Sequence, residues 1–196
     1  MTWQQLSLFT DEELGLKQTY GLIGLSGYAR SGKDTVAKIL IDKYGYTRIG
    51  FADSIREFLL RINPILSDGH RLGEYVKMYG WEITKAQTEV RRLLQETGTV
   101  ARDMFGADFW VSQVVREMGK NPDKKYVITD VRFQNEASMI KLNGGQIWRV
   151  ERPEVSAINN HISESDMDNY TPDQLIINSG SIEELELLIK TRMLDA

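Results

Sequence analysis

Short apolar runs alternate with helix-length segments along most of the chain, which is the pattern of a parallel β-sheet covered by helices. Five runs predict buried strands, at residues 22–25, 46–51, 126–129, 146–150 and 175–177. Between and after them, the pattern predicts helices over residues 33–44, over residues 133–142 and from Ser181 onward. Ser181 and Glu184 have the spacing of a capping box, which fixes the start of this last helix. The pattern predicts an α/β fold.

Residues 53–119 do not follow this alternation. They contain no strand pattern and are predicted to form several helices, in a connection longer than most crossovers between parallel strands. We expect a helical insert here that binds and covers a substrate. Because the chain has no repeat and no Pro/Ser-rich linker, residues 21–196 are predicted to be one domain, preceded by an N-terminal extension of residues 1–20.

Composition narrows the class of protein. The 196 residues include 24 Lys plus Arg and 28 Asp plus Glu, and a net charge of −4 argues against a binder of polymeric nucleic acid. The absence of cysteine excludes disulfides, thiolate metal sites and cysteine nucleophiles. The sequence has no signal-peptide pattern and no apolar stretch long enough to span a membrane. We therefore expect a soluble cytoplasmic protein.

The pattern G-x-x-x-x-G-K occurs between the first strand and the first helix. Glycines let the backbone approach phosphates closely, and the N–H groups of the loop and of the following helix point at the anion. The lysine adds a charge that follows the β- and γ-phosphates. This context predicts a loop that binds ATP with Mg²⁺, formed by Gly27, Arg30, Ser31, Gly32, Lys33, Asp34 and Thr35.

The metal-binding part of this loop has an unusual sequence. Asp34 occupies the position where Ser or Thr normally binds Mg²⁺, and Thr35 follows it. Either residue is a candidate metal partner, and the sequence does not distinguish between them. Asp130, at the end of the third strand, is placed like a Walker-B carboxylate and is a third candidate. The alternative for Asp130 is a helix N-cap.

The loop string GYARSGKDTVA resembles the phage-type deoxynucleoside monophosphate kinases, which are P-loop proteins similar to the nucleoside monophosphate kinases. Further strings agree in the same order: FADSIRE at 51–57, RRLLQETGTVARDMFGADFWV at 91–111, TDVRFQNEA at 129–137 and HISE at 161–164. The likeness covers roughly residues 21–190. The GKDT ending is shared with other small-molecule kinases, including animal-type phosphomevalonate kinase, but its combination with LLQETGT and DVRFQNEA is more specific.

The resemblance implies transfer of the ATP γ-phosphate to a deoxynucleoside 5′-monophosphate, with ATP and Mg²⁺ as cofactors. It implies a five-stranded parallel sheet of order 2-3-1-4-5, flanked by helices. It also implies a phage or prophage gene acting in the host cytoplasm, and it is compatible with a homodimer.

Two groups of residues in the helical insert are candidates for binding the acceptor. Asp53 and Arg56 follow the second strand, where open α/β sheets bind ligands, although Asp53 also suits an N-cap for a helix from Ser54. Arg91 and Gln95 share a helix face, and Arg102 adds a second guanidinium for a phosphate monoester. A solvated basic face is the alternative for these arginines.

Other candidates lie farther along the chain. Trp110 is a candidate for base stacking, although core packing suits it better. Arg132 is placed to neutralise the transferring phosphoryl group, as a catalytic residue with Lys33 and Asp130. Glu136 and Glu164 are candidate substrate contacts. On the fourth strand, Arg152 is expected nearer the site than Arg149, because it lies beyond the end of the strand.

Three other functions remain open at this point. A kinase of another small phosphorylated metabolite shares the same loop, and a non-catalytic nucleotide-binding module would keep the loop but not the arginines. A regulatory GTPase is disfavoured because the chain lacks N-K-x-D.

The N-terminal extension contains a short motif of its own. Gln5, Leu6, Ser7, Leu8 and Phe9 resemble the peptide by which bacterial replication proteins dock onto the sliding clamp. The favoured alternative is that these apolar side chains cover a patch on the protein itself, or that the match is chance.

Overall fold

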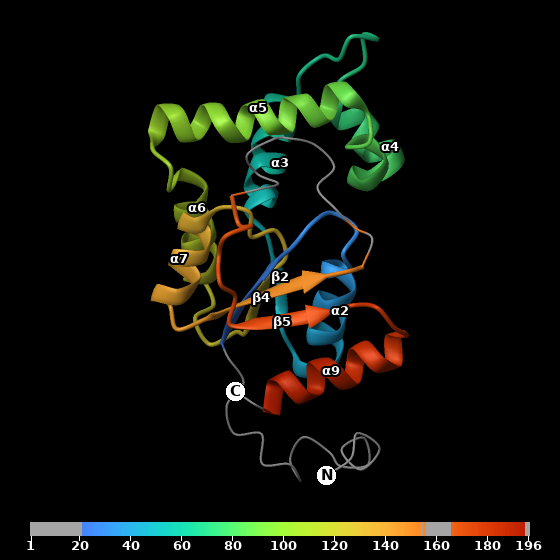
Figure 1. The fold of residues 1–196 in the computed structure, drawn as a ribbon. Helices are drawn as coiled ribbons and strands as arrows, with labels where there is room; N and C mark the ends of the chain where they lie inside the picture. The colour runs from blue at the N-terminus through green and yellow to red at the C-terminus, as the bar shows by residue number, and fades with distance from the viewer. Residues whose placement is uncertain (1–20, 154, 156–165, 195–196) are drawn as a thin grey trace. The chain divides into compact units, whose positions relative to one another are not determined.

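The computed structural model describes residues 21–153, 155 and 166–194 (Figure 1). The chain divides into two compact units, which are described separately. One, the sheet unit, consists of the described parts of Met1–Ile49 and Asn121–Ala196. The other, the helical unit, is Gly50–Lys120. Within the described residues, no helix is long and apolar enough to cross a membrane.

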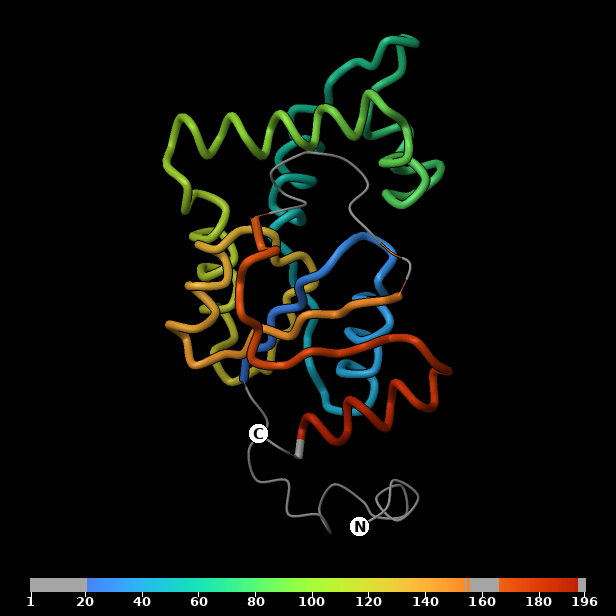
Figure 2. The backbone as a smooth tube through the Cα atoms, in the orientation of Figure 1, coloured from blue at the N-terminus to red at the C-terminus, as the bar shows by residue number. Residues whose placement is uncertain are grey.

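The sheet unit contains five parallel strands in the order β2-β3-β1-β4-β5. This confirms both the α/β class and the predicted strand order. In Figure 2 the blue tube of the first strand runs beside the orange tube of the fourth, although more than a hundred residues separate them in sequence. The strands are β1 (Leu22–Ser26), β2 (Thr47–Ile49), β3 (Tyr126–Ile128), β4 (Gln146–Glu151) and β5 (Gln174–Ile177).

Helices cover both faces of this sheet. Helices α2 (Lys33–Tyr44) and α9 (Ile182–Leu194) cover one face, where Leu40 and Ile189 pack against Leu25, Trp148 and other strand residues. Helix α7 (Gln134–Leu142) covers the other face and contacts β1 and β4. Because both faces are covered, β1 (LIGLS) and β3 (YVI) are almost wholly apolar, which is why their sequence signal was strong.

Gly24 makes the close packing of α7 possible. A Cβ atom at this position would lie 2.5 Å from Cδ1 of Ile140 and 2.9 Å from Cγ2 of Val131. The middle of β1 therefore needs glycine for packing rather than for backbone freedom.

The predicted boundaries were accurate except around the second strand. This strand ends at Ile49, and Phe51 begins the next helix with Gly50 as its N-cap. The prediction of a strand through residue 51 was wrong because Phe51 is buried, and an apolar run alone does not tell a buried strand from a buried helix start. The predicted capping box of α9 is confirmed: the Ser181 N–H donates to Glu184 Oε2 (2.8 Å) and the Glu184 N–H donates to Ser181 Oγ (3.3 Å).

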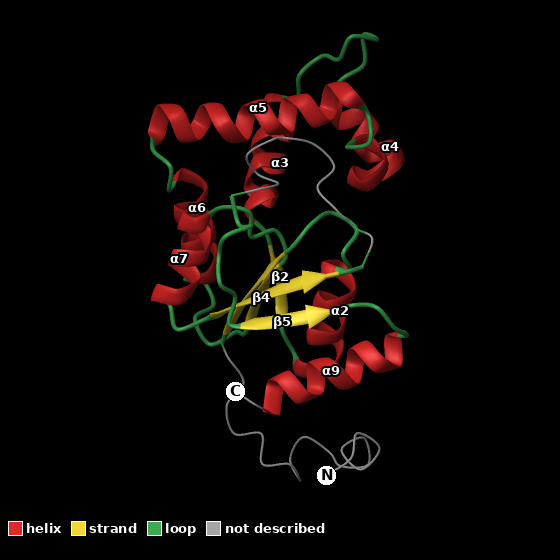
Figure 3. Cartoon of the chain, viewed as in Figure 1, coloured by secondary structure: helices red, strands yellow, loops and turns green. Residues whose placement is uncertain are grey.

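The helical unit is built from helices and loops alone, with one isolated β-bridge between Ile65 and Arg71 (Figure 3). Its small core contains Leu59, Leu66, Leu72 and Val90, all at most 4% exposed. The helices are α3 (Phe51–Ile62), α4 (Leu72–Thr84), α5 (Thr88–Phe105) and α6 (Phe109–Met118).

Candidate active site

The loop from Gly27 to Gly32 has a backbone that only glycine permits at both ends. Gly27 has φ 123° and Gly32 has φ 104°, in the region that L side chains avoid. A Cβ on Gly27 would lie 2.2 Å from the carbonyl oxygen of Val150, and one on Gly32 would lie 2.2 Å from Asn178 Nδ2. The two glycines of the motif are therefore required by both conformation and space. The result is a tight turn that leads directly into α2.

Lys33 folds back over this turn. Its Nζ donates to the carbonyl oxygens of Gly27 and Tyr28, both at 2.7 Å. The Tyr28 carbonyl also accepts the backbone N–H of Ser31 (3.2 Å). The ammonium group is thus held at the mouth of the loop, where a phosphate would compete with the two carbonyls for its protons.

Asn178 holds the other end of the loop. Its Nδ2 donates to the Ser31 carbonyl at 2.9 Å, and its own backbone N–H donates to the Glu151 carbonyl at 2.7 Å. The Ser31 hydroxyl is buried without a hydrogen-bond partner in the described part of the chain. A buried polar atom of this kind, inside a cradle that a Cβ would fill, fits a loop that is completed by an anionic ligand.

The three candidate metal partners lie close to this loop in the chain or in the sheet. Asp34 is exposed and Thr35 half-buried in the first turn of α2. Asp130 follows β3, and the backbone bonds on either side of it run to the neighbouring strands: the Thr129 N–H donates to the Ile49 carbonyl (3.3 Å), and the Val131 N–H to the Leu25 carbonyl (3.2 Å). Asp130 therefore lies at the carboxyl edge of the sheet, as predicted.

These residues fit the chemistry of Mg²⁺. The described residues hold no cluster of three or more His, Cys, Asp or Glu side chains able to bind a metal. Mg²⁺ in nucleotide sites usually takes one or two protein ligands, and the nucleotide phosphates and water supply the rest.

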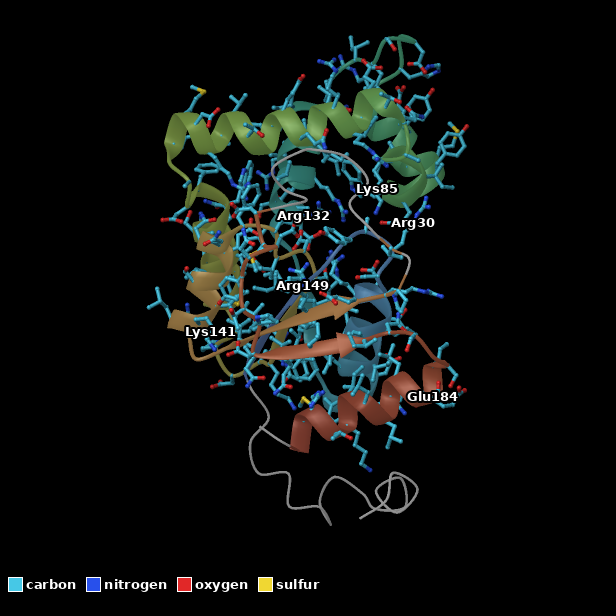
Figure 4. The ribbon with its side chains drawn as sticks, viewed as in Figure 1. Arg30, Lys85, Arg132, Lys141, Arg149 and Glu184 are labelled. Carbon is cyan, nitrogen blue, oxygen red and sulfur yellow. The ribbon has the colours of Figure 1, made fainter. Side chains whose placement is uncertain are left out.

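A pocket lies beside the loop at the same edge of the sheet. Arg132 and Arg149 both line this pocket, beside the start of the loop, and both arginines are labelled in Figure 4. The sequence predicts that Arg152 lies nearer the site than Arg149. The structure shows the reverse, because Arg149 lines the pocket and Arg152 is exposed. The lining residues are Gly27, Tyr28, Val131, Arg132, Arg149, Met167 and Asp168.

Glu136 has a structural duty. Its side chain is 1% exposed, and its Oε2 accepts the backbone N–H groups of Arg132 (2.8 Å) and Phe133 (3.1 Å) at the start of α7. These contacts make Glu136 the cap of this helix, so a role in substrate binding is not favoured by the geometry. The N-cap of α7 is Phe133, so the alternative role of Asp130 as a helix N-cap was wrong.

In the helical unit, Arg56 lies near two side chains that can interact with its guanidinium group, Asp53 and Trp81. Its Nη1 lies 3.5 Å from Asp53 Oδ1, and its guanidinium carbon lies 5.8 Å from the ring centroid of Trp81. Nε of Arg56 is buried with no hydrogen-bond acceptor among the described residues. Asp53 lies in the first turn of α3 rather than at its N-cap, so the capping alternative was wrong.

The predicted arginine face of α5 is also present within this unit. Arg91, Gln95, Gly98 and Arg102 follow at intervals of four, three and four residues and so form one stripe along the helix. A Cβ on Gly98 would lie 3.3 Å from Cδ1 of Ile55, so the stripe faces α3 at Gly98. Arg92, by contrast, points to solvent and pairs with Glu96 at 2.9 Å.

Trp110 is a core residue. It is 2% exposed, its Nε1 donates to the Gly98 carbonyl at 3.0 Å, and its ring packs edge-on against Phe109 and Phe58. This geometry favours packing over base stacking. Glu164 and the motif from Gln5 to Phe9 lie outside the described residues.

The fold and the loop together define a P-loop phosphotransferase. The family described as "Deoxynucleotide monophosphate kinase" matches residues 66–189 of this chain. A protein of Acanthamoeba polyphaga mimivirus, whose name assigns it to the deoxynucleotide monophosphate kinases, is 32% identical over 186 residues, which cover 83% of this chain and 91% of the relative. The chain belongs to the deoxynucleotide monophosphate kinase family.

Two further similarities concern a phage protein and a solved structure. The deoxynucleotide monophosphate kinase of Escherichia phage RB69 is 32% identical over 101 residues, which cover 49% of this chain and 41% of the phage protein. Among solved structures, a dephospho-CoA kinase from Campylobacter jejuni covers 89% of this chain and 96% of its own, with 15% identity and a TM-score of 0.48.

Proposed function

We propose that this enzyme transfers the γ-phosphoryl group of ATP to deoxynucleoside 5′-monophosphates, giving ADP and the diphosphates. The observation that carries the proposal is family membership over most of the chain, which supplies the class of acceptor. The geometry of the phosphate loop supports ATP as the donor.

The donor is bound in the sheet unit. The loop from Gly27 to Gly32 and the first turn of α2 present backbone N–H groups to the β- and γ-phosphates, and Lys33 shifts from loop carbonyls to phosphate oxygens. Mg²⁺, when bound, neutralises negative charge on the phosphates. Asp130 and either Asp34 or Thr35 would hold the ion, directly or through water.

Catalysis is electrostatic and positional. The acceptor is a phosphate that is already ionised at neutral pH, so no general base has to remove a proton from it. Arg132 and Lys33 stabilise the negative charge that spreads over the moving phosphoryl group. Arg149 contributes to the same pocket, but its contacts with Glu151 and Met167 suggest that it shapes the site rather than reaching for the ligand.

The acceptor is recognised by side chains of the helical unit. Arg91 and Arg102 have the spacing for a phosphate monoester, since each guanidinium can make paired bonds to its oxygens. Gln95 lies between them on the stripe and has both a donor and an acceptor for a sugar or a base. Asp53 and Arg56 add a second polar group on α3.

The predictions of a homodimer, of clamp docking through residues 5–9 and of action in the host cytoplasm stay predictions. So does the exclusion of polymeric nucleic acid as a partner.

The deciding experiment is a thin-layer assay with labelled ATP against all deoxynucleoside and ribonucleoside monophosphates, with phosphomevalonate as a non-nucleotide acceptor. We expect labelled deoxynucleoside diphosphates. Lys33→Ala is expected to remove transfer while the protein stays folded. Lys38→Ala, which removes an exposed lysine from the same helix, should keep normal turnover. Transfer to phosphomevalonate alone, or full activity of Lys33→Ala, would overturn the proposal.

A further inference from the structure

Asp166, Met167 and Asp168 form a short segment, here called the brace, that contacts three separate parts of the sheet unit. Asp166 binds the start of α7, where its Oδ2 accepts the Gln134 N–H (2.9 Å) and its carbonyl accepts Gln134 Nε2 (3.1 Å). Met167 is buried, and its carbonyl accepts Nη1 of Arg149 from β4 (2.8 Å). Asp168 Oδ1 accepts the Tyr28 hydroxyl (2.9 Å). The brace therefore joins α7, β4 and the phosphate loop.

Tyr28 is held through both its hydroxyl and its ring. The guanidinium carbon of Arg149 lies 5.8 Å from the centroid of the Tyr28 ring. Arg149 is itself fixed, because its Nε donates to Glu151 Oε1 at 2.8 Å and its side chain is only 13% exposed. The bond to Asp168 holds the pKa of Tyr28 above its usual range, since a hydroxyl that donates to a carboxylate resists losing its proton, and burial adds to this. Tyr28 therefore stays a donor at neutral pH.

The backbone of Tyr28 is part of the phosphate loop. Its carbonyl accepts Lys33 Nζ at 2.7 Å and the Ser31 N–H at 3.2 Å. The position of this one carbonyl thus affects both the turn of the loop and the lysine that meets the phosphates. A tyrosine fixed at the end of its side chain leaves this carbonyl less freedom, and a preorganised loop loses less entropy when it binds an anion.

We propose that Tyr28 and Asp168 are positioning residues, which act through the Tyr28 carbonyl and Lys33 to preorganise the loop for ATP. The inference rests on the proposed use of this loop as the ATP site. It extends that proposal to a residue 140 positions away from Tyr28 in sequence.

The test is a titration of the full-length protein with the β,γ-imido analogue of ATP and Mg²⁺, followed by calorimetry. The variants are Tyr28→Phe, Asp168→Ala, their combination, and Asp168→Asn, which keeps an oxygen that can accept the hydroxyl. Tyr126→Phe is the matched control, because it removes a tyrosine hydroxyl that donates to the Asn121 carbonyl (3.2 Å), next to the start of β3 and away from the loop. Thermal melts of every variant accompany the titrations.

We expect Tyr28→Phe and Asp168→Ala each to raise the Kd for the analogue about threefold. This is less than the roughly tenfold that a whole hydrogen bond is worth, because the bond exists with and without ligand and only its ordering of the loop changes the affinity. The double variant should be no weaker than Asp168→Ala, because Asp168→Ala already removes the contact with the Tyr28 hydroxyl together with the 3.5 Å pair between Asp168 Oδ1 and Arg149 Nη2. The Kd of Asp168→Asn for the analogue should stay within about twofold of the wild-type value, and so should the Kd of Tyr126→Phe.

Additive effects, an unchanged Kd in Tyr28→Phe, or a loss in Asp168→Asn as large as in Asp168→Ala would overturn the proposal. So would a loss of affinity that only follows a fall in Tm, because a purely structural contact would act that way. The titration contains no acceptor, so its result stands whichever monophosphate the enzyme uses. Failure of the proposed function in the acceptor assay is therefore a separate outcome.

Discussion

Nδ2 of Asn178 lies 2.9 Å from the carbonyl oxygen of Ser31, so the residue that follows β5 is bonded to the phosphate loop 147 positions earlier. The last strand of the sheet thereby supports the first functional loop of the chain. The glycines allow the tight turn of the loop, and this contact with Asn178 helps to hold the turn in its shape.

Removing the amide of Asn178 should weaken ATP binding. Asn178→Ala loses one neutral hydrogen bond, worth about 1 kcal/mol. The Kd for ATP should rise by up to about fivefold, the limit reached if the whole of that free energy serves to hold the loop in its binding shape. Asn178→Asp should be worse, because it sets a carboxylate against a carbonyl and near an anionic ligand. Calorimetric titration measures both. Asn143→Ala is the control, since it removes an amide that donates to the Met139 carbonyl at the end of α7 (2.8 Å). An equal loss in that control would refute the assignment.

Gly32 and Gly45 make a matched pair for separating backbone strain from steric overlap. Both have positive φ, at 104° and 71°, but a Cβ on Gly45 meets nothing within 4 Å, whereas one on Gly32 meets Asn178 Nδ2 at 2.2 Å. Gly45→Ala should lower the free energy of unfolding by about 1 kcal/mol through strain alone. Gly32→Ala should cost about 1 kcal/mol more, because Asn178 must leave Ser31, and it should also lose ATP binding. Urea denaturation of the two variants measures the difference, and equal costs would contradict it.

The sequence predicted the sheet well because β1 and β3 at its centre are buried on both faces and their apolar runs are short and continuous. Such runs, with a glycine loop after the first, are enough to place Lys33 and Asp130 at one edge of the sheet. Strand order came from the family resemblance, because nothing local along the chain shows which strands are neighbours.

The details of the pocket were beyond sequence reasoning. Its position beyond the strand end makes Arg152 the better candidate in the sequence, yet Arg149 is the one that lines the pocket. Its place depends on Glu151 and Met167, and contacts of this kind have no period in the sequence. Glu136 shows a different limit. Its neighbourhood in the sequence suits a substrate contact, and only the buried geometry shows that it caps α7.

The two candidate metal partners in the first turn of α2 should differ in their effect on Mg²⁺. We expect either Asp34→Ala or Thr35→Ala, but not both equally, to raise the Mg²⁺ concentration needed for half-maximal activity. Asp42→Ala provides a control on the same helix, because Asp42 is an exposed carboxylate paired with Lys38. Activity measured across a Mg²⁺ series at saturating ATP gives the answer. Wild-type Mg²⁺ dependence in both variants would show that this part of the loop does not bind the metal.

Glu89 should make the helical unit sensitive to acid. Its carboxylate accepts the Ser67 hydroxyl (2.7 Å) and the Ser67 N–H (3.0 and 3.1 Å), which lower its pKa, the hydroxyl contributing most. A carboxylate with a lowered pKa in the folded state stabilises the protein above its unfolded pKa of about 4.5, and this stabilisation is lost as the pH falls further. Glu89→Gln should therefore flatten the fall in Tm below that pH, and Ser67→Ala should do the same. A fall as steep as in the wild type would contradict this.

Arg102 and Arg92 test which side of α5 meets the acceptor. Arg102 lies on the stripe with Gln95 and Gly98, which faces α3 at Gly98, whereas Arg92 points away and pairs with Glu96. If the stripe grips the monophosphate, Arg102→Ala loses a charge-assisted contact worth about 1.5–3 kcal/mol, and KM for the monophosphate should rise about ten- to a hundredfold. KM for ATP should change far less. Arg92→Ala should leave both constants near their wild-type values, because an exposed pair on a helix contributes only a few tenths of a kcal/mol to stability. Steady-state kinetics with each substrate varied in turn separates the cases. An equal rise in both constants for Arg102→Ala would assign this arginine to the transition state or to the packing of α5, and a large effect of Arg92→Ala would place the acceptor on the opposite side of the helix.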